Sequence, residues 1–264
     1  MDDMSVGLLA VGLLYGGFIG AAIGLASIIR PLRFLGIRSR KLAAGVLLAA
    51  ASVIVAGMLM PAPLERADGV RTDLDRAMPA WQFRERHRVR VEAPPAEVYR
   101  ALGAVTADDS FLFRTLTWIR SPHFSTPARE TILTPGTGKP ILDVMRSGFL
   151  PMSEDPGREV VFATVFYTLP QPRLGDRSPE HFIALSSPGF AKVTVNFRVE
   201  PAGRGASELT TETRVFATDA RSARVFTAYW RVIYPGSALI RISWLRAIKK
   251  RAEARTDSAT RPHA

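Results

Sequence analysis

Two apolar segments without a charged residue stand near the start of the chain, Ser5–Ile29 and Leu42–Met60. As α-helices they would extend roughly 37 and 28 Å, enough to cross a hydrocarbon core about 30 Å thick. The pattern therefore predicts a transmembrane hairpin over residues 1–60, with spans at about 5–29 and 42–60. A cleaved signal peptide is the alternative for the first segment, but Asp2 and Asp3 stand where a signal peptide needs basic residues. A buried core helix is the alternative for the second segment.

All the charged residues of the loop between the two segments are basic. Its charged residues are Arg30, Arg33, Arg38, Arg40 and Lys41. Basic residues next to a span resist translocation, so we expect the loop in the cytoplasm and both chain ends on the opposite side of the membrane. The basic turn also favours a second crossing over a buried core helix. The sequence thus predicts an integral membrane protein whose N-terminus and C-terminal domain are extracytoplasmic.

Glycine recurs every fourth residue in the first segment, at Gly12, Gly16, Gly20 and Gly24. Such a stripe of small residues lets a second helix backbone approach closely. One interpretation is packing against the alanine-rich second segment, whose small residues are Ala43, Ala44, Gly45 and Ala49 to Ala51. The other is a homodimer through the same four glycines, because spacing does not name the partner.

The chain has a net charge of +11 and no cysteine. Disulfides, thiolate chemistry and cysteine-based metal sites are therefore excluded. The positive charge could meet anionic lipid or nucleic acid, but the sequence has no aromatic and basic nucleic-acid-binding module. We therefore expect membrane lipids, and no nucleic acid, as partners. Roughly 200 residues follow Met60, which suits one globular domain better than two.

The remaining sequence predicts a linker at 61–80, a domain at 81–255 and a disordered tail at 256–264. The domain begins with a strand at Arg86–Glu92 and a helix at Ala96–Val105, and a second helix is predicted at Ser110–Arg120. Further strands are predicted at Ile141–Phe149, Arg158–Tyr167, Phe182–Leu185, Ala191–Glu200 and Glu208–Thr218. A long helix, capped by Thr218 or Asp219 and interrupted at Pro235-Gly236, closes the domain.

The strand Ala191–Glu200 has the clearest alternation in the chain. Apolar side chains occupy one face, namely Val193, Val195, Phe197 and Val199. Polar side chains occupy the other, namely Lys192, Thr194, Asn196, Arg198 and Glu200. Strict alternation predicts that the first face is buried and the second lies in water.

The order of elements, and the stretch Val89-Arg90-Val91-Glu92-Ala93-Pro94-Pro95-Ala96-Glu97-Val98-Tyr99 in particular, resembles the START-like (SRPBCC) superfamily. That superfamily includes polyketide cyclase/dehydrase-like and lipid-transfer families, and the resemblance covers about Phe83–Arg255. It implies an α+β helix-grip fold, in which a curved antiparallel sheet surrounds a long C-terminal helix and an apolar cavity lies between them. The chain looks most like uncharacterised bacterial members, which implies a bacterial inner membrane as its location.

On that fold, six apolar residues are candidates for the cavity lining: Val193, Val195, Phe197, Phe226, Trp230 and Ile233. Four polar residues could place hydrogen-bonding groups inside it: Asp143, Arg146, Glu159 and Asn196. The alternative is a solid core, because periodicity marks a buried face without showing whether the space behind it is filled.

The sequence contains no recognisable catalytic motif. None of the four histidines has a second histidine or a carboxylate at metal-ligand spacing, and His87, on the apolar face of the first strand, is interpreted as a hydrogen-bonded structural residue. We expect no catalytic residue, cofactor or metal. The predicted function is a membrane-anchored binding protein for a hydrophobic small molecule or lipid. A cyclase/dehydrase-like enzyme acting on a hydrophobic substrate and a membrane-complex interaction module are the alternatives.

Overall fold

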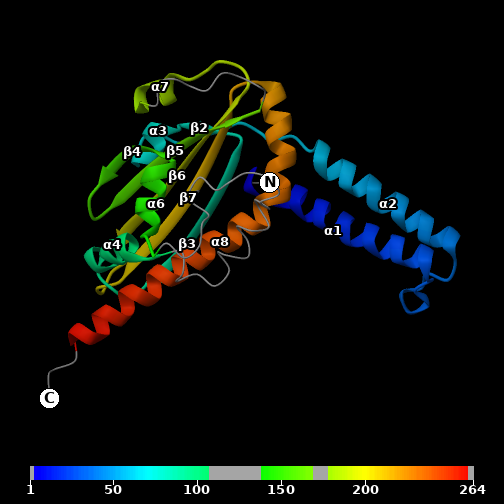
Figure 1. The fold of residues 1–264 in the computed structure, drawn as a ribbon, viewed down its shortest axis with the longest axis horizontal. Helices are drawn as coiled ribbons and strands as arrows, with labels where there is room; N and C mark the ends of the chain where they lie inside the picture. Colours follow the sequence, from blue (N-terminus) through cyan, green and yellow to red (C-terminus); the bar gives the residue numbers. More distant parts are fainter. Residues whose placement is uncertain (1–2, 107–137, 169–177, 261–264) are drawn as a thin grey trace. The chain divides into compact units, whose positions relative to one another are not determined.

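The computed structural model describes residues 3–106, 138–168 and 178–260 (Figure 1). The chain divides into two compact units. The helical unit comprises residues 1–65 and 224–234, and the sheet unit comprises residues 66–223 and 235–264. The predicted helix Ser110–Arg120 lies outside the described residues.

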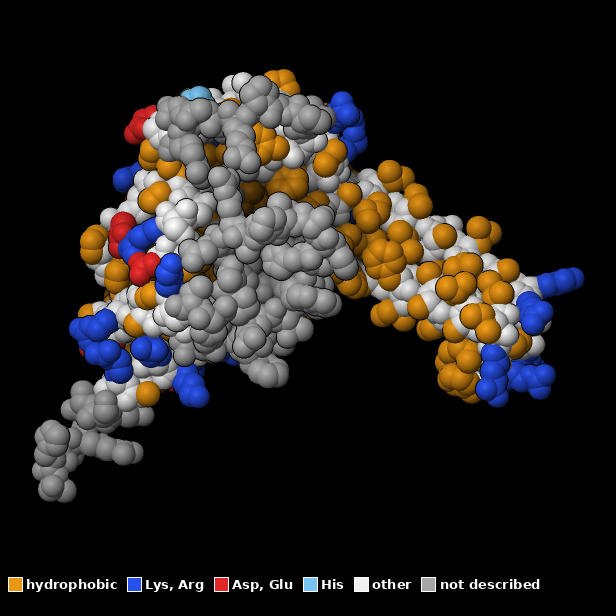
Figure 2. Space-filling view, viewed as in Figure 1, with side chains coloured by type: hydrophobic (Ala, Val, Ile, Leu, Met, Phe, Trp, Pro, Cys, Tyr) orange, Lys and Arg blue, Asp and Glu red, His pale blue; other side chains and the backbone are white. Residues whose placement is uncertain are grey.

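The helical unit is built on two long apolar helices, α1 (Asp3–Ile29) and α2 (Arg40–Leu59). A short 3-10 turn, η1 (Arg33–Leu35), lies between them, and the Ser39 side chain caps α2 by accepting a hydrogen bond from the Leu42 N–H at 3.2 Å. Both helices are long and apolar enough to cross a membrane. Only 22% and 17% of their most apolar stretches are buried, whereas a core helix of a soluble protein is mostly buried. Figure 2 shows hydrophobic side chains gathered over these helices, with Lys and Arg side chains at the loop between them.

Glycine allows close contact between α1 and α2. A Cβ atom added at Gly17 would meet Ile54 Cγ1 at 2.6 Å, and one at Gly24 would meet the Leu47 backbone at 3.0 Å. Gly20 also faces α2, since its Cβ would lie 3.2 Å from that of Ala50, whereas Gly12 and Gly16 have nothing within 4 Å. Half of the predicted stripe therefore packs inside the hairpin, and the homodimer stays a prediction.

A segment from the end of the chain, Arg224–Tyr234, completes the helical unit. The buried Arg231 guanidinium donates hydrogen bonds to the carbonyl oxygens of Met58, at 2.6 Å, and Met60. The last carbonyl groups of a helix have no partner within it, and a cation there also complements the helix dipole. In the other direction, the Tyr15 hydroxyl donates to the Val232 carbonyl at 2.6 Å. The segment is thus bonded to both apolar helices.

The sheet unit contains one five-stranded antiparallel sheet of order β3-β7-β6-β5-β4. Its strands are β3 (Phe83–Val91), β4 (Leu150–Asp155), β5 (Glu159–Tyr167), β6 (Phe190–Pro201) and β7 (Ser207–Ala217). Its described helices are α3 (Asp73–Ala77), α4 (Pro95–Ala104), α6 (Ile141–Gly148), α7 (Pro179–Ala184) and the long α8 (Ala220–Thr260), of which residues 224–234 belong to the helical unit. The α+β class, the long C-terminal helix and four of the predicted strands are confirmed. The predicted interruption at Pro235-Gly236 is wrong, because α8 continues through both residues.

Two predicted strands are wrong, because Ile141–Phe149 is helix α6 and Phe182–Leu185 falls at helix α7. In α6 the buried residues are Ile141, Leu142 and Met145, a helical spacing that a run of apolar residues disguised. In α7 the Ser178 side chain caps the helix, and a proline follows in its first turn. Strand β4 was not predicted, since it is short and lies at the sheet edge.

One face of the sheet, called the grip face here, carries the main core. Its side chains include Phe162, Val195, Phe197 and Leu209, and they cluster with Trp244, Leu245 and Ile248 of α8. The rings of Phe197 and Trp244 lie 6.0 Å apart between centroids. Helices α4 and α6 add Val98, Leu102 and Met145 to the same cluster. The grip face therefore packs against the C-terminal part of α8.

The opposite face, called the outer face here, is buried in its middle, contrary to the alternation prediction. Lys192, Thr194 and Asn196 are at most 7% exposed, and only Arg198 and Glu200 keep part of their surface in water. The cover comes from residues of the predicted linker, which form β1 (Glu65–Arg66), α3 (Asp73–Ala77) and β2 (Ala80–Trp81). Helix α3 packs on β5 and β6, and its Leu74 and Ala77 cluster with Val161. This cover also brings polar groups to the sheet, since the Asp73 N–H donates to Glu159 and Asp75 pairs with Arg214.

Asp219 caps the start of α8 and gives a testable contribution to stability. Its carboxylate accepts hydrogen bonds from the Ser222 hydroxyl, the Gly189 N–H and the Ser222 and Arg221 N–H groups, which hold its pKa well below the usual range. Asp219→Ala should lower the free energy of unfolding by about 1–2 kcal/mol at neutral pH. Since the native pKa is depressed, this contribution is present above the unfolded pKa of about 3.9 and should shrink as the pH falls below it.

Urea unfolding of the full-length protein in detergent at pH 7 and pH 3 measures both effects. Asp68→Ala, at an exposed aspartate, is the matched control and should change little at either pH. A difference between Asp219→Ala and the wild type that is equal at the two pH values would contradict the assignment.

Candidate functional site

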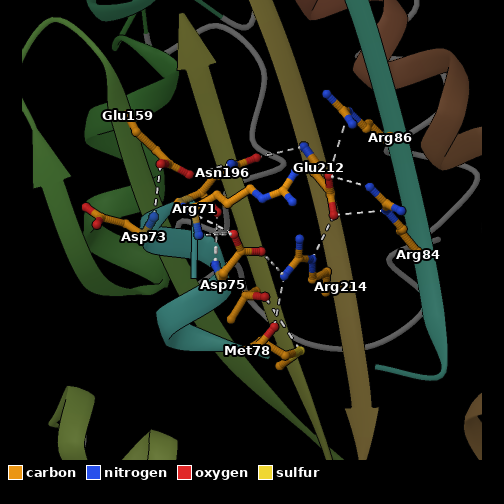
Figure 3. Close-up of polar contacts among 12 residues, drawn as sticks. Arg71, Asp73, Asp75, Met78, Arg84, Arg86, Glu159, Asn196, Glu212 and Arg214 are labelled. Atoms are coloured by element: carbon orange, nitrogen blue, oxygen red, sulfur yellow. Dashed lines mark hydrogen bonds and ion pairs between the residues drawn. The ribbon is translucent and has the colours of Figure 1, made fainter. Parts of the chain in front are cut away.

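Two clusters of buried polar side chains lie on opposite faces of the sheet. On the outer face the cluster centres on Arg214 of β7 (Figure 3). Its guanidinium donates to Asp75 Oδ1 at 2.8 Å, to Glu212 Oε1 at 2.7 Å and to the Met78 carbonyl at 3.0 Å. The Trp81 ring covers the same guanidinium, with Arg214 Cζ 3.9 Å from its centroid. The guanidinium of Arg214 is therefore hydrogen-bonded along its edge, and its planar face is stacked on the Trp81 ring.

The outer-face cluster extends across four strands, β3, β5, β6 and β7. Glu212 also pairs with Arg84 of β3, at 2.9 Å, and its N–H donates to Asn196 Oδ1 at 2.9 Å. The Asn196 amide donates to Glu159 Oε1 at 2.6 Å, and Glu159 Oε2 accepts from the Asp73 N–H at 3.1 Å. The predicted polar candidates Glu159 and Asn196 are thus brought together, but on the outer face and not on the grip face.

The polar groups of the outer-face cluster form hydrogen bonds and ion pairs with one another. Burial raises the pKa of Asp75, but hydrogen bonds from the Arg71 N–H, from Arg214 and from Thr72 outweigh it, so the pKa lies below its usual range. Asp75 and Thr72 also form a reciprocal capping box at the start of α3. Since the carboxylates and the guanidinium are held by protein groups, the cluster fixes residues 71–78 to the sheet and leaves little hydrogen-bonding capacity for a ligand.

The second cluster lies on the grip face and centres on Glu85 of β3. The Glu85 side chain has no exposed surface, and its two oxygens contact His87 Nε2 at 2.9 Å and the Ser237 hydroxyl of α8 at 2.8 Å. In the β3–β7 register, His87 lies opposite Thr211, whose hydroxyl oxygen accepts from Arg241 of α8 at 3.3 Å. Polar groups from β3, β7 and α8 therefore converge beside the apolar core.

His87 is the partly exposed member of the grip-face pair. Its side chain is 18% exposed, unlike the fully buried Glu85. When Glu85 is ionised it can only accept, so a neutral His87 ring carries its proton on Nε2 and presents Nδ1 as an acceptor. Within residues 3–106, 138–168 and 178–260, the contact with Glu85 is the only hydrogen bond of the His87 side chain. The pair can therefore bind a hydrogen-bond donor or exchange a proton.

Sequence reasoning noted His87 but missed Glu85. Both residues share the parity of Val89 and Val91 on β3, and Val91 is in the core. Two ionisable residues spaced by two on a core-facing strand were the available signal. The arginines at the intervening positions point to the outer face, and they make the strand as a whole look strongly basic.

The structure places the six apolar candidates in both units. Val195 and Phe197 are buried in the grip-face core and Val193 is half-buried on the same face. Phe226 and Trp230 are buried in the helical unit, where their rings stack with centroids 5.9 Å apart, and Ile233 is half-buried there. The α8 residues that cluster with Phe197 are Ile240, Trp244, Leu245 and Ile248. A shared cavity lining stays a prediction.

The remaining polar candidates, Asp143 and Arg146, lie on the surface of α6. Arg146 pairs with Asp143 and with Glu154 of β4, each at 3.0 Å. The Tyr99 hydroxyl donates to Glu154 at 3.0 Å, and burial together with that carboxylate raises the pKa of Tyr99 to about 12. This is a largely solvent-exposed ion-pair cluster. The described residues contain no group of three or more His, Cys, Asp or Glu side chains that could hold a metal ion.

No protein-family model and no curated protein matches this chain. Among solved structures, the chain is similar to the crystal structure of the Zhui aromatase/cyclase from Streptomyces sp. R1128. The two share 12% sequence identity and a TM-score of 0.27, over 67% of this chain and 98% of that one.

Proposed function

We propose that this chain is a membrane-anchored protein that binds a hydrophobic small molecule or lipid against the grip face of its sheet, without chemistry of its own. The observation that carries the proposal is the pairing of two exposed apolar helices with an antiparallel sheet packed on a long C-terminal helix. The first feature suits a bilayer. The second is the arrangement implied by the resemblance to START-like proteins.

Anchoring gives such a binder a physical advantage. A poorly soluble ligand partitions into lipid, so a domain attached to that lipid meets it at a high local concentration. The basic loop between α1 and α2 supports an orientation with the sheet unit on the extracytoplasmic side of a bacterial inner membrane. Protease added to spheroplasts should then digest the C-terminal domain, and protection of that domain would overturn the orientation.

The binding test uses the full-length protein purified in detergent, washed, denatured and extracted for mass spectrometry. We expect an apolar molecule to be recovered in near-stoichiometric amount. Val193→Glu, which places a charge on the grip face at a half-buried position, should reduce the recovered amount at least tenfold. Ile183→Glu is the matched control, because Ile183 is 49% exposed on α7, and it should retain the ligand. A folded wild-type protein without any bound molecule would contradict the proposal.

A second candidate is an enzyme of the cyclase/dehydrase kind acting on a hydrophobic substrate. It is favoured by one observation, the convergence of Glu85, His87 and Ser237 beside the apolar core. A general base oriented by a carboxylate has this composition. Recovery of an unmodified ligand from both the wild type and His87→Gln favours binding, whereas a chemically different molecule in the two would favour the enzyme.

A further inference from the structure

The polar cluster around Glu85 shows which ligands the grip face would select, and this inference rests on the proposed function. Five side chains of β3 face that side, at positions 83, 85, 87, 89 and 91. Three are apolar, and two are Glu85 and His87. Burying a carboxylate opposes folding unless it is bonded, and apolar residues at both positions would extend the core without that penalty. Glu85 and His87 therefore have a role other than filling the core.

The contacts of Glu85 indicate that it orients the His87 ring. Its carboxylate contacts the His87 ring and the Ser237 hydroxyl, and in the described part of the chain no lysine or arginine forms an ion pair with it. A carboxylate that accepts from one imidazole nitrogen fixes the ring tautomer and its orientation. The hydrogen bond from Ser237 holds the second oxygen and so ties the pair to α8.

We propose that the Nδ1 atom of His87 accepts a hydrogen bond from the hydroxyl group of an uncharged amphiphile, whose hydrocarbon part lies along the apolar grip face. Among the described residues no partner is bonded to Nδ1, which is the acceptor of an imidazole whose Nε2–H is held by Glu85. A hydroxyl group can donate a hydrogen bond to Nδ1 without bringing a charge, whereas an ionised carboxylate has no hydrogen to donate there. Long-chain alcohols and hydroxylated polycyclic lipids belong to this class.

The charged and polar groups around the pair agree with a neutral ligand. On β7, Thr211 and Thr213 lie opposite His87 and Glu85 in the register. On α8, Ser237 contacts Glu85, and Arg241 donates to Thr211 and lies over the Trp244 ring, 5.4 Å from its centroid. Among the described residues, the side chains around His87 thus include one acidic and one basic group rather than charges of a single sign.

The test measures selectivity with two fluorescent probes, a long-chain primary alcohol and the matching hydrocarbon without the hydroxyl group. The full-length protein in lipid nanodiscs should bind the alcohol about tenfold more tightly, the value of one hydrogen bond. His87→Leu should bring the ratio of the two dissociation constants to about one. His87→Gln should keep part of the preference, because its amide can donate to Glu85 while its carbonyl accepts. Arg88→Leu, at the next residue on the outer face, is the control and should leave the ratio unchanged.

The outcomes separate this inference from the proposed function. If the wild type binds both probes equally, or if His87→Leu keeps the tenfold preference, the role of His87 is wrong while hydrophobic binding stands. If the wild type binds neither probe, the proposed function itself is contradicted. Circular dichroism of each variant checks folding, and His87→Gln keeps the test decisive should His87→Leu fail to fold.

Discussion

Replacing Arg214 by methionine should lower the free energy of unfolding by about 3–5 kcal/mol. Arg214 is 5% exposed, and its removal leaves Asp75 and Glu212 as adjacent buried carboxylates without their shared cation. The Met78 carbonyl loses its hydrogen bond and the Trp81 ring loses its stacking partner as well. Urea unfolding of the full-length protein in detergent, followed by tryptophan fluorescence, measures the change.

The control for this variant is Arg88→Met on the neighbouring strand β3. Arg88 is 71% exposed and lies 3.9 Å from Glu208, an ion pair of the kind that contributes at most about 1 kcal/mol. Arg214→Lys keeps the charge without the planar fork and should fall between the two. A similar loss for Arg214→Met and Arg88→Met would show that the outer-face cluster is not buried as described.

Truncation of Phe197 to alanine should lower the free energy of unfolding by about 3–5 kcal/mol. The Phe197 side chain has no exposed surface, and it packs in the main core against Trp244 and its neighbours. The result also distinguishes a filled core from an open cavity at this position. A ring that borders empty space has fewer atoms in contact, so its removal costs less.

Equilibrium unfolding of Phe197→Ala beside Phe197→Leu provides the measurement. Leucine keeps most of the buried volume and should lose clearly less stability than alanine. A loss below about 1 kcal/mol for Phe197→Ala would place an open space behind the ring and would make Phe197 part of a ligand site rather than of the core.

The parts of the fold that the sequence predicted are those specified by local patterns. The apolar segments of α1 and α2, and the alternation in β6 and β7, identify their own elements because burial repeats with the period of the structure. The whole segment Ile141–Phe149 was predicted as a strand, although it forms α6, because a short apolar run fits both periods. Local pattern alone could not decide between them.

The candidate sites depended on contacts between distant residues, so they were harder to predict. The polar face of β6 was expected in water because the sequence does not show that α3 covers it. Glu159 and Asn196 were predicted as polar groups of a site on the grip face. They bond to each other on the outer face instead, beneath the cover that α3 provides. The pairing of Glu85 with Ser237 joins residues 152 positions apart, a contact without any local signature.

The hydrogen bonds from Arg231 to the end of α2 have a consequence for biosynthesis. Synthesis proceeds from the N-terminus, so α1 and α2 emerge early. The side chain that caps α2 is added only after all the described strands of the sheet unit have been made. A nascent chain shorter than 231 residues holds Met58 and Met60 without this donor. The helical unit therefore reaches its final form late. A product terminated before residue 231 lacks the hydrogen bonds between α8 and the end of α2.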